Sequence, residues 1–356
     1  MSILKRPLSI CTIAIIGSFV LIALFQETEK IILSTWLILL SWFIAVTMHE
    51  LGHVVFGILN GLTFQFVAVG PFTISKEKNK LRFTENKQWM YAGGVTLFTP
   101  PSLHTPNLAK KWGMLVLGGP FVSFISFLLS FGVYQFIDIA FLQFLVVFHL
   151  LIFIMTSIPL KMGTMNTDGL TMLTLWKNDE KSRTLLHNIF VNRELFSEER
   201  PRNWSTELTD ISRSNISKVR NNASFDTMFL FYAESDKYGR KHAAKYLEPM
   251  LKVVPKKEEK YMIGAFHSLY LLHQFLDNEE NNKERLIYHL PYITRLDLFS
   301  YYRSVAIVKY LEGQEIESQK YLAKAEKEIK NPNQSLGFLQ LEREWFEELK
   351  ARMASA

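Results

Sequence analysis

Four long apolar segments constrain the fold of this chain more than any other feature of its sequence. They cover about residues 8–25, 31–59, 112–136 and 139–160, and each approaches the roughly 20 residues that a helix needs to cross a bilayer. No small-residue cleavage pattern follows the first segment, so we expect it to be retained rather than removed as a signal peptide. The sequence therefore predicts a membrane-embedded domain with four transmembrane helices over residues 1–170.

The distribution of lysine and arginine predicts the orientation of these helices. The net charge is +6, but the basic residues cluster beside apolar segments, which favours topology signals over a nucleic-acid groove. They lie at the N-terminus and in the loop between the second and third segments, whereas the other two connections carry only Lys30 between them. We therefore expect a multi-pass protein of the cell membrane, with its N-terminus and C-terminal half in the cytoplasm and no nucleic-acid partner.

The long loop between the second and third segments contains short runs of β-branched and aromatic residues. These runs cover residues 63–69, 71–75, 80–84 and 95–99, with Gly, Asn and Lys between them. Such runs are typical of strands. The loop over residues 63–99 is therefore predicted to form a small sheet, lying partly against the membrane.

The second half of the chain reads as a soluble protein. Residues 171–222 are polar and are predicted to be a linker, and from residue 223 to 356 apolar residues recur at helical spacing. The stretches around Gly239 and Gly313 resemble one another, and two units of about 37 residues are near the tetratricopeptide length of about 34. The expected fold class is an all-α membrane protein with a small β insertion, followed by a soluble α-helical, tetratricopeptide-like solenoid. Other α-solenoids are the alternative, and either could bind a protein partner.

The segment His49–His53, with the sequence HELGH, carries the strongest chemical signal. Residues four apart share one helix face, so both imidazoles can reach one metal ion, and Glu50 projects beside them. A bound zinc ion would lower the pKa of its water toward about 7, and Glu50 could take a proton from that zinc-bound water. Cys11 is the single cysteine, so further ligands must be His, Asp or Glu. Such polar groups next to lipid rarely lack a role.

Catalytic zinc usually has a third protein ligand, and four residues near the apolar segments are candidates. Asp138 lies on the opposite connection, about a membrane thickness away. His149 is midway along the fourth segment and about 15 Å too deep; it would instead hydrogen-bond a neighbouring helix or face a water-filled cavity. His104 and Asp168 both lie on the cytoplasmic side, and their positions slightly favour Asp168.

Three motifs together resemble the site-2 protease family of intramembrane zinc metalloproteases. They are His49–His53 on one apolar segment, Gly118-Gly119-Pro120 on another, and Asp168-Gly169 after a third. The resemblance covers roughly residues 31–170, which correspond to the family's three-span core, with one extra span ahead of it. It implies Zn²⁺ bound by His49, His53 and Asp168, with Glu50 as general base. It also implies a substrate that is itself a membrane-spanning protein or peptide.

The region before Asp168 departs from the family's pattern, which is Asn-x-x-Pro, four residues, then Asp-Gly. Thr156 stands where the asparagine would be, eight residues separate Pro159 from Asp168, and Asn166 is close by. An inactive relative that binds membrane partners through its helical C-terminal domain is therefore an alternative. A membrane-anchored protease for soluble peptides is another, which the location of the motif in a span disfavours.

Cleavage inside a membrane requires the substrate helix to open, because its carbonyl groups are already hydrogen-bonded. An edge of the sheet predicted over residues 63–99 could pair with the unwound strand. This is a hypothesis about substrate binding.

Overall fold

A computed structural model of the chain shows two compact units. It describes residues 6–77, 80–162, 165–218, 224–252, 260–277, 283–295, 297–330 and 336–354. The units are Met1–Leu186 and His187–Ala356, and the division falls inside helix α6 (Glu180–Leu195). The segment predicted as a linker, residues 171–222, is largely helical; its polar composition belongs to helices with exposed faces.

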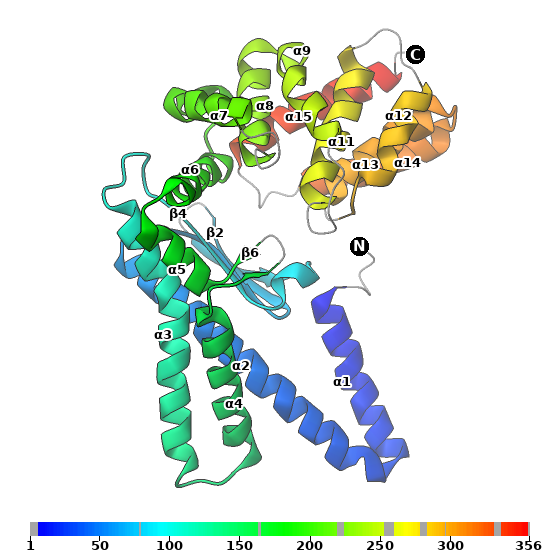
Figure 1. The fold of residues 1–356 in the computed structure, drawn as a ribbon. Helices are drawn as coiled ribbons and strands as arrows, with labels where there is room; N and C mark the ends of the chain where they lie inside the picture. The colour runs from blue at the N-terminus through cyan, green and yellow to red at the C-terminus, as the bar shows by residue number, and fades with distance from the viewer. Residues whose placement is uncertain are drawn as a thin grey trace. The chain divides into compact units, whose positions relative to one another are not determined.

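Four helices of the first unit are long and apolar enough to cross a membrane, which confirms the four predicted segments. Helix α2 is the longest, at 31 residues, or about 46 Å. It packs against α3 and α4, whereas α1 diverges from it beyond the short turn that joins them (Figure 1). The helices are α1 (Pro7–Leu24), α2 (Glu29–Leu59), α3 (Leu108–Tyr134) and α4 (Ala140–Ser157).

Helices α2 and α3 meet backbone to backbone. A β-carbon on Gly52 would overlap the carbonyl oxygen of Gly118, and one on Gly118 would overlap the carbonyl oxygen of Gly52. Small residues allow this close approach between membrane helices. The contact fixes the register between the two glycine-containing motifs found in the sequence.

The loop between α2 and α3 forms a four-stranded antiparallel sheet, which confirms the predicted β insertion. The strand order is β3-β2-β1-β4, so β3 and β4 are its edges. Val67 and Val69 of β1 pack on Val46 of α2, which anchors the sheet to the membrane helices. The strands are β1 (Thr63–Val69), β2 (Phe72–Glu77), β3 (Lys80–Glu85) and β4 (Val95–Thr99).

A short hairpin connects α4 to the next helix. It consists of β5 (Lys161–Met162) and β6 (Met165–Asn166), and it leads directly into α5 (Asp168–Lys177). Helix α5 packs against α3 and α4. The chain therefore returns to the ends of the membrane helices immediately after leaving them.

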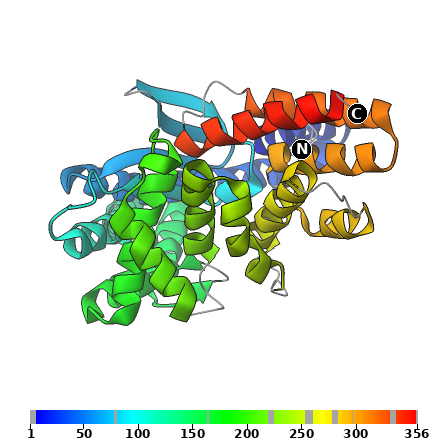
Figure 2. The ribbon, with the colours of Figure 1, turned by 90° about the horizontal axis from the view of Figure 1, so that it is seen from above.

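The second unit is built from helices, several of which pack as neighbours in sequence, such as α7 with α8 and α13 with α14. Figure 2 shows α15, in red, which packs against α11 and α14. Its core contains the fully buried Arg303, paired with Glu342. The helices that follow α6 are α7 (Thr206–Lys218), α8 (Ser224–Tyr238), α9 (Arg240–Ala243), α10 (Leu247–Leu251), α11 (Lys260–Asp277), α12 (Lys283–His289), α13 (Leu298–Leu311), α14 (Glu315–Ile329) and α15 (Gly337–Ala354).

The two similar stretches share a local turn, but a tetratricopeptide-like solenoid is not confirmed. Gly239 and Gly313 both have positive φ, at 91° and 75°, and each follows a helix. Beyond Gly239 the chain breaks into α9, a 3₁₀ turn and α10, whereas beyond Gly313 it forms the continuous α14. The similarity thus reflects a glycine with positive φ that follows a helix in both stretches, a conformation that glycine adopts readily.

Candidate metal centre

Three donor atoms converge where α2 meets the start of α5. The Nε2 atoms of His49 and His53 are 3.2 Å apart, and Oδ2 of Asp168 lies 3.3 Å from the first and 3.5 Å from the second. Zinc at about 2.0–2.1 Å from tetrahedral ligands separates those ligands by about 3.3–3.4 Å. The spacing therefore fits a single zinc ion. Among the residues that the structure describes, this is the one such group of three donors.

Both imidazoles are oriented by α3. Nδ1 of His49 lies 3.0 Å from Oγ of the buried Ser123, and Nδ1 of His53 lies 2.9 Å from the carbonyl oxygen of Leu115. The backbone nitrogen of Gly119 lies 3.3 Å from the same Nδ1 atom of His53, so α3 contacts this nitrogen twice. Partners of this kind fix the ring and its tautomer in metal sites, and here they direct both Nε2 atoms toward Asp168.

The glycine pair of α3 makes room for these rings. A β-carbon on Gly119 would overlap Nε2 of His53 and would lie 2.7 Å from Cε1 of His49. The two histidines thus rest directly on the backbone of α3, which explains why this position is glycine.

The side chain of Glu50, on α2, lies against the start of the edge strand β4. Its side chain is buried, and Thr96 donates a hydrogen bond from Oγ1 to Oε2 over 2.6 Å. Gly94 precedes β4 with a φ of 101°, and a β-carbon there would lie 2.6 Å from Oε1 of Glu50. A side chain at residue 94 would therefore displace the carboxylate. The sequence did not predict the roles of Ser123, Thr96 and Gly94. The Gly93-Gly94 pair ahead of a predicted strand was the one local feature that indicated an unusual backbone there.

The hairpin β5–β6 absorbs the extra residues ahead of Asp168. Thr167 donates from Oγ1 to the carbonyl oxygen of Ile158 at 2.7 Å and accepts from the backbone N–H of Leu160 at 3.0 Å. The same hydroxyl caps α5 by accepting from the N–H of Leu170 at 3.3 Å. Thr167 thus ties the end of α4 to the start of α5 and holds Asp168 at the helix start.

Gly169 allows α5 to approach the end of α4. A β-carbon at this position would overlap the carbonyl oxygen of Ser157. Burial raises the pKa of the Asp168 carboxyl, but its contacts with His49 and His53 outweigh this effect and lower the pKa to about 2. Asp168 is therefore ionised at neutral pH, as a metal ligand must be.

The other candidate ligands lie outside this group. His104 and Asp138 are exposed, in the loop before α3 and in the connection after it. His149 is buried and lies within electrostatic range of His49. His149 was expected to lie about 15 Å too deep to be a ligand; its electrostatic interaction with His49 places it nearer, but it is not one of the three donors.

The altered region around Thr156 offers few polar groups to the site. Oγ1 of Thr156 donates to the carbonyl oxygen of Ile152, one turn earlier in the same helix, at 2.8 Å. Asn166 is exposed in β6. The amide of the family's asparagine has no counterpart at residue 156.

Comparison with known proteins agrees with this geometry. The chain matches the family described as peptidase family M50 over residues 37–329, which include all three motifs. No curated protein and no solved structure matches it. The family match covers most of the chain, and the apolar helices and the His-His-Asp group are the features expected of a membrane metalloprotease. The chain therefore belongs to peptidase family M50, the site-2 protease family.

Proposed function

We propose that this chain is an intramembrane zinc metalloprotease that hydrolyses peptide bonds in or near transmembrane segments of membrane proteins or peptides. His49, His53 and Asp168 would hold the zinc ion, and Glu50 would act as general base. The observation that carries this proposal is the spacing of the three donor atoms, 3.2–3.5 Å, which fits the tetrahedral spacing around zinc. The two histidines lie within an apolar span, next to the buried carboxylate of Glu50.

The proposed role of each residue follows from its hydrogen bonds. Zinc, when bound, would polarise a peptide carbonyl and acidify a water molecule. Thr96 holds Oε2 of Glu50, which leaves Oε1 to accept the proton of the attacking water and pass it to the leaving amine. The glycine at residue 94 keeps the space beside Oε1 open.

Zinc content and cleavage test this assignment together. Glu50→Gln should abolish cleavage of a membrane substrate while the purified protein keeps its zinc, because Glu50 is not a ligand. Asp168→Ala should lose zinc and cleavage together. Asp138→Ala, which removes an exposed carboxylate between α3 and α4, is the control and should change neither. Full zinc content in Asp168→Ala would remove the proposed ligand set.

We infer that β4 binds the opened substrate. It is an edge strand, and it begins beside Glu50, so a strand added to this edge would lie next to the reacting groups. Proline cannot donate to such a ladder. Proline at Val95 or at Leu97, whose side chains do not hydrogen-bond to Glu50, should therefore impair cleavage and leave zinc content intact, whereas alanine at the same residue should have little effect. Unchanged cleavage in both proline variants would exclude strand addition.

The proposed orientation places the N-terminus and the sheet on the cytoplasmic side. Arg6, ahead of α1, pairs with Glu85 of β3 at 3.1 Å, which supports their lying on one side of the membrane. Exposed Phe72, Leu81 and Phe83 give the sheet an apolar surface, and such a surface suits contact with the lipid boundary.

A binding protein without protease activity is the second candidate. It is favoured by Thr156, whose hydroxyl is used within its own helix. If Glu50→Gln behaves as wild type in cells and in cleavage assays, this second function holds and the protease assignment fails.

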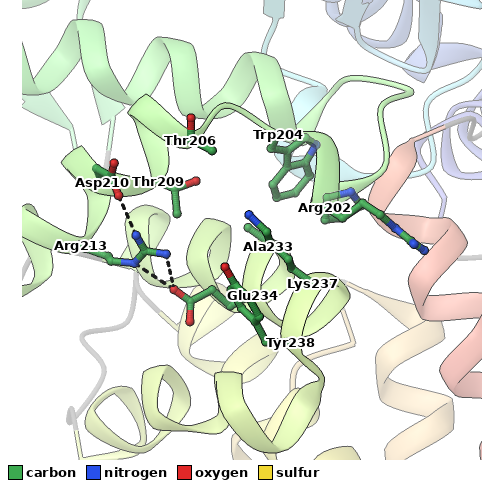
Figure 3. A pocket seen from close by; sticks show the side chains of 11 residues that line it. Arg202, Trp204, Thr206, Thr209, Asp210, Arg213, Ala233, Glu234, Lys237 and Tyr238 are labelled. Atoms are coloured by element: carbon green, nitrogen blue, oxygen red, sulfur yellow. Dashed lines mark hydrogen bonds and ion pairs between the residues drawn. The ribbon is translucent and has the colours of Figure 1, made fainter.

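The second unit contains a pocket whose lining combines charged and aromatic side chains. The pocket has a volume of about 170 Å³, and Figure 3 shows Arg213 at its wall, paired with Asp210 and Glu234. Lys237 and Tyr238 are exposed at the same pocket. We propose that it recruits substrates or a regulatory protein. Lys237→Glu combined with Tyr238→Ala should then change which membrane proteins are cleaved in cells, with zinc content unchanged.

A further inference from the structure

His149 is an ionisable side chain buried in an apolar helix without a complete set of partners. It is 3% exposed, and its Nδ1 atom has no hydrogen-bond partner among the residues that the structure describes. A buried polar group without a partner lowers stability, and ionisable groups within membrane spans are rare without a role. The Nδ1 atom therefore has room for a partner that the described residues do not supply.

The position of His149 brings it to the metal centre. It lies eight residues before the end of α4, and His49 lies ten residues before the end of α2, which is about 12 Å and about 15 Å from the respective helix ends. The two side chains are within electrostatic range of each other. His149 is thus beside the site and at a similar depth.

His149 is nevertheless not a fourth ligand of the group. It is absent from the set of donors that lie within 4.8 Å of one another. His49 cannot serve as its partner either, because Nδ1 of His49 faces Ser123 and its Nε2 faces His53 and Asp168. The free nitrogen of His149 is left for a molecule that enters the site.

We propose that His149 binds the main chain of the substrate segment that is opened inside the membrane. This inference rests on the proposed protease function. An unwound segment carries N–H and C=O groups that find no water in the hydrocarbon region. A neutral imidazole offers one donor and one acceptor, so it can satisfy either group. Because the hydroxyl of Thr156 bonds within its own helix, His149 would supply the polar group that α4 presents to the substrate.

The test measures substrate binding separately from cleavage. The probe is a single transmembrane helix of Leu and Ala, interrupted by an Asn-Gly pair, in lipid nanodiscs. Its affinity is measured for full-length Glu50→Gln protein alone and with a second change at residue 149. His149→Leu should weaken binding about tenfold or more, and His149→Gln, which keeps a donor and an acceptor, should stay within about threefold of Glu50→Gln alone.

Two further measurements separate this role from a structural one. Zinc content should stay unchanged in both residue-149 variants, and cleavage of a short soluble peptide should fall less than cleavage of the transmembrane probe. Gln143→Leu removes an exposed polar side chain from the same helix and should bind the probe normally.

Three results would overturn the proposal: normal binding by His149→Leu, equal losses in His149→Leu and His149→Gln, or loss of zinc in His149→Leu. Failure of the protease function has a different signature. The wild type would then leave the probe uncleaved, whether or not changes at residue 149 alter its binding.

Discussion

At the scale of single residues, the centre depends on contacts that leave almost no free space. The two imidazoles lie against the backbone of α3 at Gly119, and their far nitrogens are held by Ser123 and Leu115. Precise placement of this kind is what metal affinity requires of the surrounding residues.

Gly119→Ala should therefore lower the zinc content of the purified protein. The added methyl group would overlap Nε2 of His53, so the rings must move away from Asp168. Gly132→Ala is a matched control in the same helix, since a β-carbon at residue 132 meets nothing within 4 Å. Metal analysis of both variants checks this, and equal zinc in the two would show that the rings can shift without loss.

Thr167 positions Asp168 through the hairpin and the helix cap. Thr167→Val keeps the shape but removes the bonds to Ile158, Leu160 and Leu170, so zinc affinity should fall at least tenfold. Thr167→Ser should restore most of it. Thr174→Val, which removes a hydroxyl that bonds within α5, should leave affinity unchanged. Competition with a chromogenic chelator measures all three, and wild-type affinity in Thr167→Val would show that Asp168 is held by other contacts.

At the scale of helices and strands, the crossing of α2 and α3 sets the geometry of the site. Gly118 and Gly52 meet directly, so a change at this crossing moves whole helices. The sheet and the β5–β6 hairpin then deliver Thr96 and Asp168 to opposite parts of the motif on α2.

Gly118→Ala should destabilise the membrane unit by about 1–3 kcal/mol, the usual cost of overpacking. Its β-carbon would overlap the carbonyl oxygen of Gly52 and would lie 2.7 Å from Cβ of Phe56. At Gly113 of the same helix, the nearest atom would be Sδ of Met172 at 3.8 Å, so Gly113→Ala should be neutral. Thermal unfolding in detergent distinguishes the two variants. Equal melting temperatures would show that α2 and α3 accommodate the added methyl group without loss of stability.

At the scale of the whole molecule, each unit has its own kind of core and surface. The membrane unit exposes many apolar side chains on its helices, as a protein solvated by lipid does. The second unit packs helices around a core that contains charged and polar side chains, among them Arg303, Glu342, His267 and His289. Acid should therefore act on this core.

The stability of the second unit should fall as the pH drops from about 6.5 to about 4. Burial lowers the pKa of His267 and of His289 to about 4 from the usual 6.5, and their Nδ1 atoms are 2.7 Å apart. The unfolded chain then binds protons at a higher pH than the folded one, so stability is complete above pH 6.5 and is lost below it. Hydrogen exchange in α11 and α12 of the intact protein, corrected for intrinsic rates, measures this loss.

The double variant His267→Gln/His289→Gln should show a weaker pH dependence in these helices over the same range. His104→Gln changes an exposed histidine of the other unit and should leave that dependence as it is. An unaltered pH profile in the double variant would assign the acid sensitivity to other groups.

The sequence by itself determined the four membrane helices, the small sheet and the HELGH motif. Each depends on neighbouring residues: apolar length decides whether a helix spans the membrane, alternation and β-branching favour a strand, and a separation of four residues places two imidazoles on one helix face. The glycine and Asp-Gly motifs indicated the family, and the profile match over residues 37–329 confirmed it.

The tertiary structure alone decided which residues, distant in sequence, contact the HELGH motif and its neighbours. Asp168 reaches the histidines because Thr167 ties the end of α4 to the start of α5 and Gly169 admits α5 beside α4. Thr96 reaches Glu50 because β4 packs against α2, and His149 comes within electrostatic range of His49 because α4 packs against α2. Residue spacing fixes positions along one helix, but the distance between two helices depends on side chains that the sequence separates by many tens of residues.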